Sequence, residues 1–222
     1  MQYEIQCEGS FPVLEITLAP GDQLVSEAGA MAWMDTAVDC KTAARGGVGA
    51  SLKRGLLGGE SFFQNTYTTQ SGGKVALVPG QPGDIRVTDM DGQRLMLERG
   101  AYLASGPNVQ IDSNFKGLKG LFSEGLFVLT ATGSGPMFWN GYGDIVEVQV
   151  EGDYIVDNGY AVAWDASLDY KVQRSSKKIR SFLFGDQLVM RFEGHGRVWT
   201  QSRSPRSLSA WVYPFRRVES KG

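Results

Sequence analysis

The stretch GDQLVSEAGAMAW, from Gly21 to Trp33, returns later in the chain as GDYIVDNGYAVAW, from Gly152 to Trp164. A constant offset of 131 (152 − 21) places six identical residues opposite one another, the closing tryptophan among them. Both copies have the pattern of a turn followed by a short apolar strand. The repetition predicts a chain built from similar units that bury their apolar faces mainly against one another.

A second recurring segment indicates three units rather than two. In each copy, basic and apolar residues lead through an acidic residue into a strand, at 52–63, 115–127 and 178–189. The acidic residues are spaced by 64 (124 − 60) and 62 (186 − 124), and a glycine turn follows each strand. Leu95–Tyr102 is a middle copy of the opening motif that keeps its Glu-x-Gly and lacks the tryptophan.

We therefore predict one all-β domain over residues 1–222 with three internal repeats, at about 1–80, 81–150 and 151–222. Alternation in Val13–Leu18 and the apolar run Ala30–Met34 are typical of its short strands, and 29 glycines suit the many turns. One short C-terminal helix is predicted, with Ser204 as its cap, Pro205 at its first position and an apolar stripe. The stripe consists of Leu208, Trp211, Val212 and Phe215, and we expect it to dock over one end of the sheets.

Five segments spread along the whole chain resemble the altered-inheritance-of-mitochondria (number twenty-four) family of uncharacterised proteins. They are Ser26–Met31, Gly58–Phe63, Pro82–Ile85, Glu124–Phe127 and Val198–Arg203. The resemblance implies three tandem units in a β-sandwich or short double-stranded β-helix, like the subunit of the trp RNA-binding attenuation protein. It supplies no catalytic residues.

Composition predicts a globular protein with a buried core, since 42% of the 222 residues are apolar and 21% are charged. No run approaches the roughly 18 apolar residues of a membrane span, and the first residues lack the pattern of a signal peptide. We therefore expect a cytoplasmic protein. Cys7 and Cys40 are expected to be reduced and buried as small apolar residues, with a disulfide as the alternative.

Several kinds of active site can be excluded from the residues. His195 is the only histidine and no Cys-x-x-Cys is present, so we expect no metal. The glycine run at 46–53 lacks the Gly-Lys-Ser/Thr of a phosphate loop and the third glycine of a dinucleotide fingerprint, so we expect no cofactor either. His195 lies between two glycines, where a solvated turn residue is favoured over a general base. A carboxylate-dependent hydrolase using Glu60, Glu124 and Asp186 stays an alternative. Their recurrence in every repeat favours a structural role instead.

Charge is divided unevenly along the chain. Residues from Lys171 onward carry 12 − 3 = +9, and the first 170 carry (22 − 12) − (24 − 3) = −11. Either the charges compensate within the fold or a neighbouring subunit, or the basic part binds an anion. The anion-binding candidates are Arg197, Arg203 and Arg206, around Trp199, with single-stranded RNA or another polyanion as ligand. A sequence pI near 5.5 and aromatic residues placed in apolar strands argue against nucleic acid.

The recurring basic and apolar segments carry the candidate interaction residues Leu56, Leu57, Leu121, Phe122, Phe182 and Phe184. These side chains either project to contact another subunit or a membrane surface, or fold back over the open ends of the sheets. We predict a non-enzymatic, oligomer-forming scaffold or interaction protein, most simply a homo-oligomer. An unidentified protein partner and a membrane surface are the other partners considered.

Overall fold

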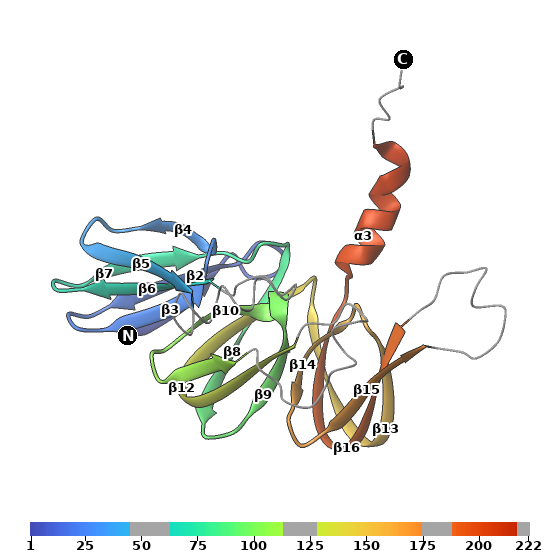
Figure 1. Cartoon of the computed structure of the whole chain (residues 1–222). Helices are drawn as coiled ribbons and strands as arrows, with labels where there is room; N and C mark the ends of the chain where they lie inside the picture. Colours follow the sequence, from blue (N-terminus) through green and yellow to red (C-terminus); the bar gives the residue numbers. More distant parts are fainter. Residues whose placement is uncertain (45–62, 113–127, 175–187, 217–222) are drawn as a thin grey trace.

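The computed structural model describes residues 1–44, 63–112, 128–174 and 188–216 (Figure 1). Strands make up most of these residues up to Gln201, and the helix α3 (Pro205–Val212) follows, extended by the 3₁₀ turn η3 (Tyr213–Phe215). The predictions of an all-β fold and of a short C-terminal helix are thus confirmed. Three groups of strands lie in a row in Figure 1, from the blue group at the left to the orange group at the right.

The first group consists of antiparallel strands. They are β1 (Gln2–Gln6), β2 (Val13–Leu18), β3 (Gln23–Glu27), β4 (Met31–Met34), β5 (Val38–Ala44), β6 (Phe63–Thr69) and β7 (Gly73–Leu77). Strand β7 lies between β2 and β4, and β6 pairs with β3 and β5. β1 adds to the outer side of β2.

The second and third groups use long strands in place of separate short ones. The second has β8 (Gly83–Asp91), β9 (Leu95–Glu98), the 3₁₀ turn η1 (Arg99–Ala101), β10 (Tyr102–Ser105), β11 (Val109–Asp112) and β12 (Val128–Tyr142). The third has β13 (Ile145–Asp157), β14 (Ala161–Asp165), β15 (Asp169–Arg174) and β16 (Leu188–Gln201). The first part of β12 pairs with β9 and β11, and its second part pairs with β8 and β10. β16 pairs in the same order with β13, β15 and β14.

The same pairings therefore occur three times, with β4, β10 and β14 as counterparts. Each of these strands has an irregularity at the same place, between residues 31 and 33, 102 and 104, and 161 and 163. A β-bulge of this kind fixes the direction in which the following side chains point. The repeat boundaries at about 80 and 150 stay predictions.

The first and third groups are related by an offset of 130 (161 − 31), one less than the sequence match indicates. Trp33 is consequently the counterpart of Ala163, and Met34 is the counterpart of Trp164. A shift of one residue moves a side chain to the other face of a sheet. Trp164 is fully buried as a result, while Trp33 is 51% exposed. The expectation that the two tryptophans are equivalent core residues is wrong.

Each pair of neighbouring groups shares a hydrophobic core. Leu103, Ala104 and Phe138 of the second group pack into the core of the first, and Val162, Ala163 and Trp199 of the third pack into that of the second. Strand pairing crosses the same two junctions, from β10 to β3 and from β14 to β9. Each large apolar side chain buried there stabilises the fold by about 1.5–3 kcal/mol.

Helix α3 begins as the sequence predicts. The Oγ atom of Ser204 accepts a hydrogen bond from the N–H of Ser207 (3.4 Å), and Pro205 occupies the first helical position. All residues from Pro205 to Arg216 are exposed, however, and Figure 1 shows the helix pointing away from the strands. The expected docking of its stripe over the sheets is wrong, because Leu208, Trp211, Val212 and Phe215 are all exposed.

Both cysteines are free and exposed, so the expectation that they are buried is wrong. Cys7 lies in the turn after β1 with a φ of 54°. Cys40 lies on β5, which has β6 as its one partner among the described strands. Their places at a turn and on an outer strand leave both thiols in contact with solvent.

Candidate functional site

The candidate interaction residues lie outside the described residues. This holds for Leu56, Leu57, Leu121, Phe122, Phe182 and Phe184, and equally for the carboxylates Glu60, Glu124 and Asp186. The candidate sites that the structure does describe are the basic end of β16 and the free edges of the row of strands.

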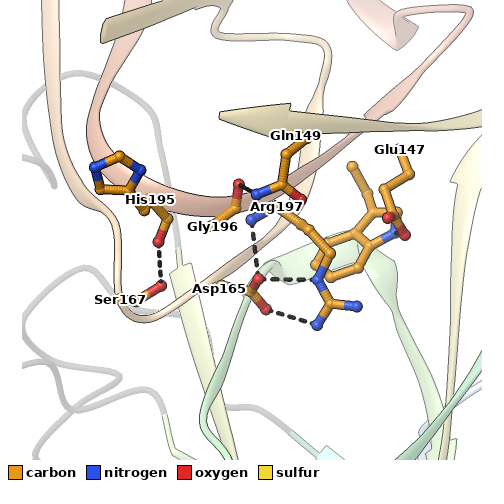
Figure 2. A network of polar contacts seen from close by, with 8 residues as sticks. Glu147, Gln149, Asp165, Ser167, His195, Gly196 and Arg197 are labelled. Atoms are coloured by element: carbon orange, nitrogen blue, oxygen red, sulfur yellow. Dashed lines mark hydrogen bonds and ion pairs between the residues drawn. The ribbon is translucent and has the colours of Figure 1, made fainter. Parts of the chain in front are cut away.

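Arg197 on β16 is bound to an acidic neighbour. Its Nε and Nη2 atoms donate to the two carboxylate oxygens of Asp165, at 3.0 and 3.1 Å, and its backbone N–H donates to the same carboxylate at 2.9 Å. This pairing raises the pKa of the Arg197 guanidinium. The guanidinium also lies over the Trp199 ring, 4.7 Å from its centroid. Figure 2 shows Arg197 and Asp165 together with Glu147. The Oε2 atom of Glu147 accepts a hydrogen bond from the Trp199 indole N–H at 2.9 Å.

The carboxylate under Arg197 recurs in the first group and has a backbone role. Asp35 accepts the backbone N–H of Lys74 at 2.9 Å, as Asp165 accepts that of Arg197. The second group has Gly106 at this position, beside Pro136, whose ring leaves no N–H to donate. An aspartate is thus present in the two groups where a backbone N–H needs an acceptor. It is absent in the second group, where proline has no N–H.

The three predicted arginines are on different elements. Arg197 lies within β16, Arg203 follows that strand, and Arg206 lies on α3. Arg203 donates to the backbone carbonyl of Ser202 at 3.1 Å, and both Arg203 and Arg206 are exposed. Their role as an anion site stays a prediction. Pairing of Arg197 with Asp165 reduces the positive charge that it offers a ligand.

His195 is an exposed residue at the bend of β16. Its backbone carbonyl accepts a hydrogen bond from Ser167 Oγ at 3.0 Å, and the neighbouring Gly196 carbonyl accepts from Gln149 Nε2 at 3.2 Å (Figure 2). These contacts use the backbone and fix the bend. Within the described ranges, no group of three or more His, Cys, Asp or Glu residues is placed to hold a metal ion.

An acid-x-Gly turn follows corresponding strands in all three groups. It reads Glu27-Ala28-Gly29 after β3, Glu98-Arg99-Gly100 after β9, and Asp157-Asn158-Gly159 after β13. Glu98 and Asp157 accept the backbone N–H of their turn glycines, at 2.8 and 3.1 Å. The first two copies can be recognised in the sequence as Glu-x-Gly. The third is missed there, because an offset of 131 aligns Glu27 with Asn158 instead of with Asp157.

Burial raises the pKa of two carboxyls in this set, Glu27 and Glu98. Burial raises the pKa of Glu27 to about 7, the nearby Glu98 adds to the rise, and Arg99 opposes it. A carboxyl that binds its proton more tightly in the folded protein stabilises the fold fully below its unfolded pKa, near 4.5. That contribution is lost as the pH rises to about 7.

We accordingly expect Glu27→Gln to unfold like the wild type at pH 4.5 and to be more stable at pH 8. The difference at pH 8 is at most about 3 kcal/mol. Urea unfolding across this pH range measures it. The exposed Glu151→Gln is the control and should follow the wild type at every pH. If Glu27→Gln raised the free energy of unfolding by the same amount at both pH values, the raised pKa of Glu27 would be contradicted.

Strand β4 is exposed where its counterparts are buried. All four residues of β10 are buried, as are the first four of β14, because each strand pairs with the neighbouring group on its second side. Among the described strands, β4 pairs with β7 alone and ends its sheet. Met31, Ala32 and Trp33 are all exposed there. The edge thus carries an apolar patch at the place where the other two groups make a junction.

The second part of β13 is the complementary edge. Its counterparts β3 and β9 each pair with a strand of the next group, whereas β13 pairs with β16 alone within the part of the chain that the structure describes. Tyr154 and Ile155 are exposed on it, Ile155 by 59%. Figure 1 shows β4 and β13 at opposite ends of the row. Among the described strands, the row therefore ends in two unlike edges, each with apolar residues in solvent.

No helix among the described residues is both long enough and apolar enough to cross a membrane.

Comparison with known proteins agrees with the architecture. The X-ray crystal structure of a protein from Streptococcus pyogenes superposes with a TM-score of 0.82 at 27% sequence identity, covering 97% of this chain and 99% of that one. An uncharacterised protein of Streptococcus pyogenes serotype M6 is 29% identical over 212 residues, 91% of this chain and 86% of that protein. The sequence profile of the family described as Mitochondrial biogenesis AIM24 matches residues 3–203. The resemblance noted in the sequence is confirmed, and the chain belongs to the AIM24 family.

Proposed function

We propose that this protein is a self-assembling, non-enzymatic scaffold in which β4 of one copy pairs with β13 of the next. The observation that carries the proposal is the exposed, apolar β4 edge, whose counterparts β10 and β14 are buried by the same kind of pairing. An unpaired strand edge with apolar side chains is a template for another strand. A second copy offers the matching strand.

The internal junctions specify the register of this contact. Ala104 lies opposite Ser26 at the first junction, and Ala163 lies opposite Leu97 at the second. By the same correspondence, Trp33 of one copy faces Val156 of the next, and Met34 faces Ile155. Two different surfaces meet in such a contact, so it is heterologous and builds either a closed ring or an open filament.

The apolar residues at these edges favour association. Burying the exposed parts of Met31, Trp33 and Ile155 contributes at most about 1.5–3 kcal/mol for each side chain, since each is already partly buried. Association costs roughly 4–15 kcal/mol in lost rigid-body freedom. The gain from burial and the cost of association are comparable in size. A single charged side chain placed at either edge should therefore dissociate the oligomer.

Size-exclusion chromatography with light scattering tests the proposal at micromolar concentration. The wild type should be an oligomer, whereas Trp33→Arg and Ile155→Arg should each be a monomer with unchanged circular dichroism. Val146→Arg is the matched control. Val146 is on the same strand as Ile155 and is 51% exposed, but it lies outside the expected contact. A monomeric wild type, or oligomers that persist in both edge variants, would refute the proposal.

Two further expectations from the sequence, the compartment and the additional contact residues, belong to this proposal. We place the assembly in the cytoplasm, where exposed free cysteines such as Cys7 and Cys40 stay reduced. Leu121 and Phe122 are proposed to add contacts between copies. Their replacement by serine should lower the oligomer mass if they do so.

A further inference from the structure

The surface of α3 and η3 combines an apolar stripe with basic charge. Leu208, Trp211, Val212 and Phe215 follow the spacing i, i+3, i+4 and i+7, which places them on one face of a helix. Each of them is exposed, Phe215 by 75%, and the rings of Trp211 and Phe215 lie 5.8 Å apart. Arg206, Ser207, Ser209 and Ala210 occupy the opposite face.

Every charged residue between 202 and 216 is basic. These residues are Arg203, Arg206 and Arg216, and no Asp or Glu interrupts them. Arg216 lies over the Tyr213 ring, 3.8 Å from its centroid, which places a cation beside an aromatic ring at the outer end of the helix. The first 170 residues carry a net charge of −11 by the count above. The basic helix thus follows a basic segment and contrasts with the acidic first 170 residues.

The base of the helix holds it away from the strands. Ser204 is buried, and the hydroxyl groups of Ser207 and Tyr160 lie 3.3 Å apart at the junction with the third group. Beyond this junction the helix projects freely in Figure 1. Its stripe therefore points into solvent at a fixed place, beside the most basic part of the chain.

We propose that α3 and η3 bind the surface of a bilayer containing anionic phospholipid. The stripe would lie in the boundary between headgroups and acyl chains, as amphipathic helices with aromatic and basic residues do. Trp211 and Tyr213 suit the headgroup level because each joins an apolar ring to a polar group. Arg203, Arg206 and Arg216 contact lipid phosphates. The acidic first 170 residues are repelled by the anionic lipid. This repulsion favours the orientation of the protein in which the helix faces the membrane.

Co-sedimentation with vesicles tests this inference on the full chain. Vesicles of phosphatidylcholine with phosphatidylglycerol should bind the wild type, and vesicles of phosphatidylcholine alone should bind it several-fold less. Raising the salt should weaken binding to the anionic vesicles. The double variant Trp211→Ser/Phe215→Ser should lose roughly tenfold in bound fraction. Its thermal stability should not change, because neither side chain packs on the strands.

Two controls match these changes. Phe11→Ser removes a ring that is 71% exposed near the opposite end of the chain and should bind vesicles like the wild type. Arg206→Glu should reduce binding to anionic vesicles, while Arg94→Glu, at an exposed turn before β9, should have the smaller effect.

Three results would overturn the inference. They are no binding at low salt, equal binding to neutral and anionic vesicles, and unchanged binding by the double variant. A double variant whose oligomer mass falls in the absence of lipid would instead assign the stripe to a contact between copies. Because both edge variants keep α3, a monomeric Trp33→Arg protein that still binds vesicles separates this inference from the proposed assembly.

Discussion

Mixing the Trp33→Arg and Ile155→Arg variants is expected to give a species of twice the chain mass, although each variant alone is a monomer. The first variant has a blocked β4 edge and an intact β13 edge, and the second has the reverse. In the mixture, the β13 edge of the Trp33→Arg protein can pair with the β4 edge of the Ile155→Arg protein. The two proteins therefore form a heterodimer with a single junction. The blocked edges at both ends prevent further growth.

This outcome follows only from a heterologous contact. In an isologous interface the same patch serves both partners, so a variant blocked on that patch stays a monomer in any mixture. Light scattering of each variant and of an equimolar mixture makes the measurement. A mixture in which Trp33→Arg is replaced by the double variant Trp33→Arg/Ile155→Arg is the control and should stay monomeric. A mixture of the two single variants that also remains monomeric would exclude the pairing of β4 with β13.

Gly133→Ala is expected to destabilise the protein far more than Gly135→Ala, although the two glycines are two residues apart in β12. Both have positive φ, 107° and 110°, so alanine is strained at either position by about 1–3 kcal/mol. A Cβ on Gly133 would meet the backbone carbonyl of Asn108, whereas a Cβ on Gly135 would meet no atom within 4 Å. The carbonyl is held by the adjoining strand and cannot rotate away as a side chain does.

We therefore expect Gly135→Ala to cost about 1–3 kcal/mol and Gly133→Ala more than about 4 kcal/mol. Urea unfolding at one fixed protein concentration measures both, since assembly would make stability depend on concentration. Equal destabilisation by the two substitutions would show that the bend of β12 has room for a side chain at Gly133.

Much of the architecture could be predicted from the residues alone. Alternating apolar positions such as Val13–Leu18 predict strands because a strand turns successive side chains to opposite faces. Ser204 and Pro205 predict the start of α3 because a hydroxyl acceptor and a fixed φ suit the first turn of a helix. The Glu-x-Gly of Glu98-Arg99-Gly100 likewise marks a turn whose acid accepts a backbone N–H.

The opening stretch, Gly21–Trp33, shows where local pattern is insufficient. Its match with Gly152–Trp164 reveals a repeat, but identities between short segments do not distinguish an offset of 131 from one of 130. Strand pairing does, because hydrogen-bonded partners fix the register and the register decides which face a side chain takes. Trp33 is on the surface and Trp164 in the core for this reason.

The sequence by itself determined the all-β composition, the repetition and the amphipathic C-terminal helix, since each depends on residues close together in the chain. Only the tertiary structure decided that β10 and β14 are covered while β4 and the end of β13 remain open, because this depends on which group of strands has a neighbour. It also decided that α3 points away from the strands. An apolar stripe shows which face of a helix would contact a partner surface. Whether the strands of this chain provide that surface depends on where the end of β16 places the helix, and here the stripe is exposed.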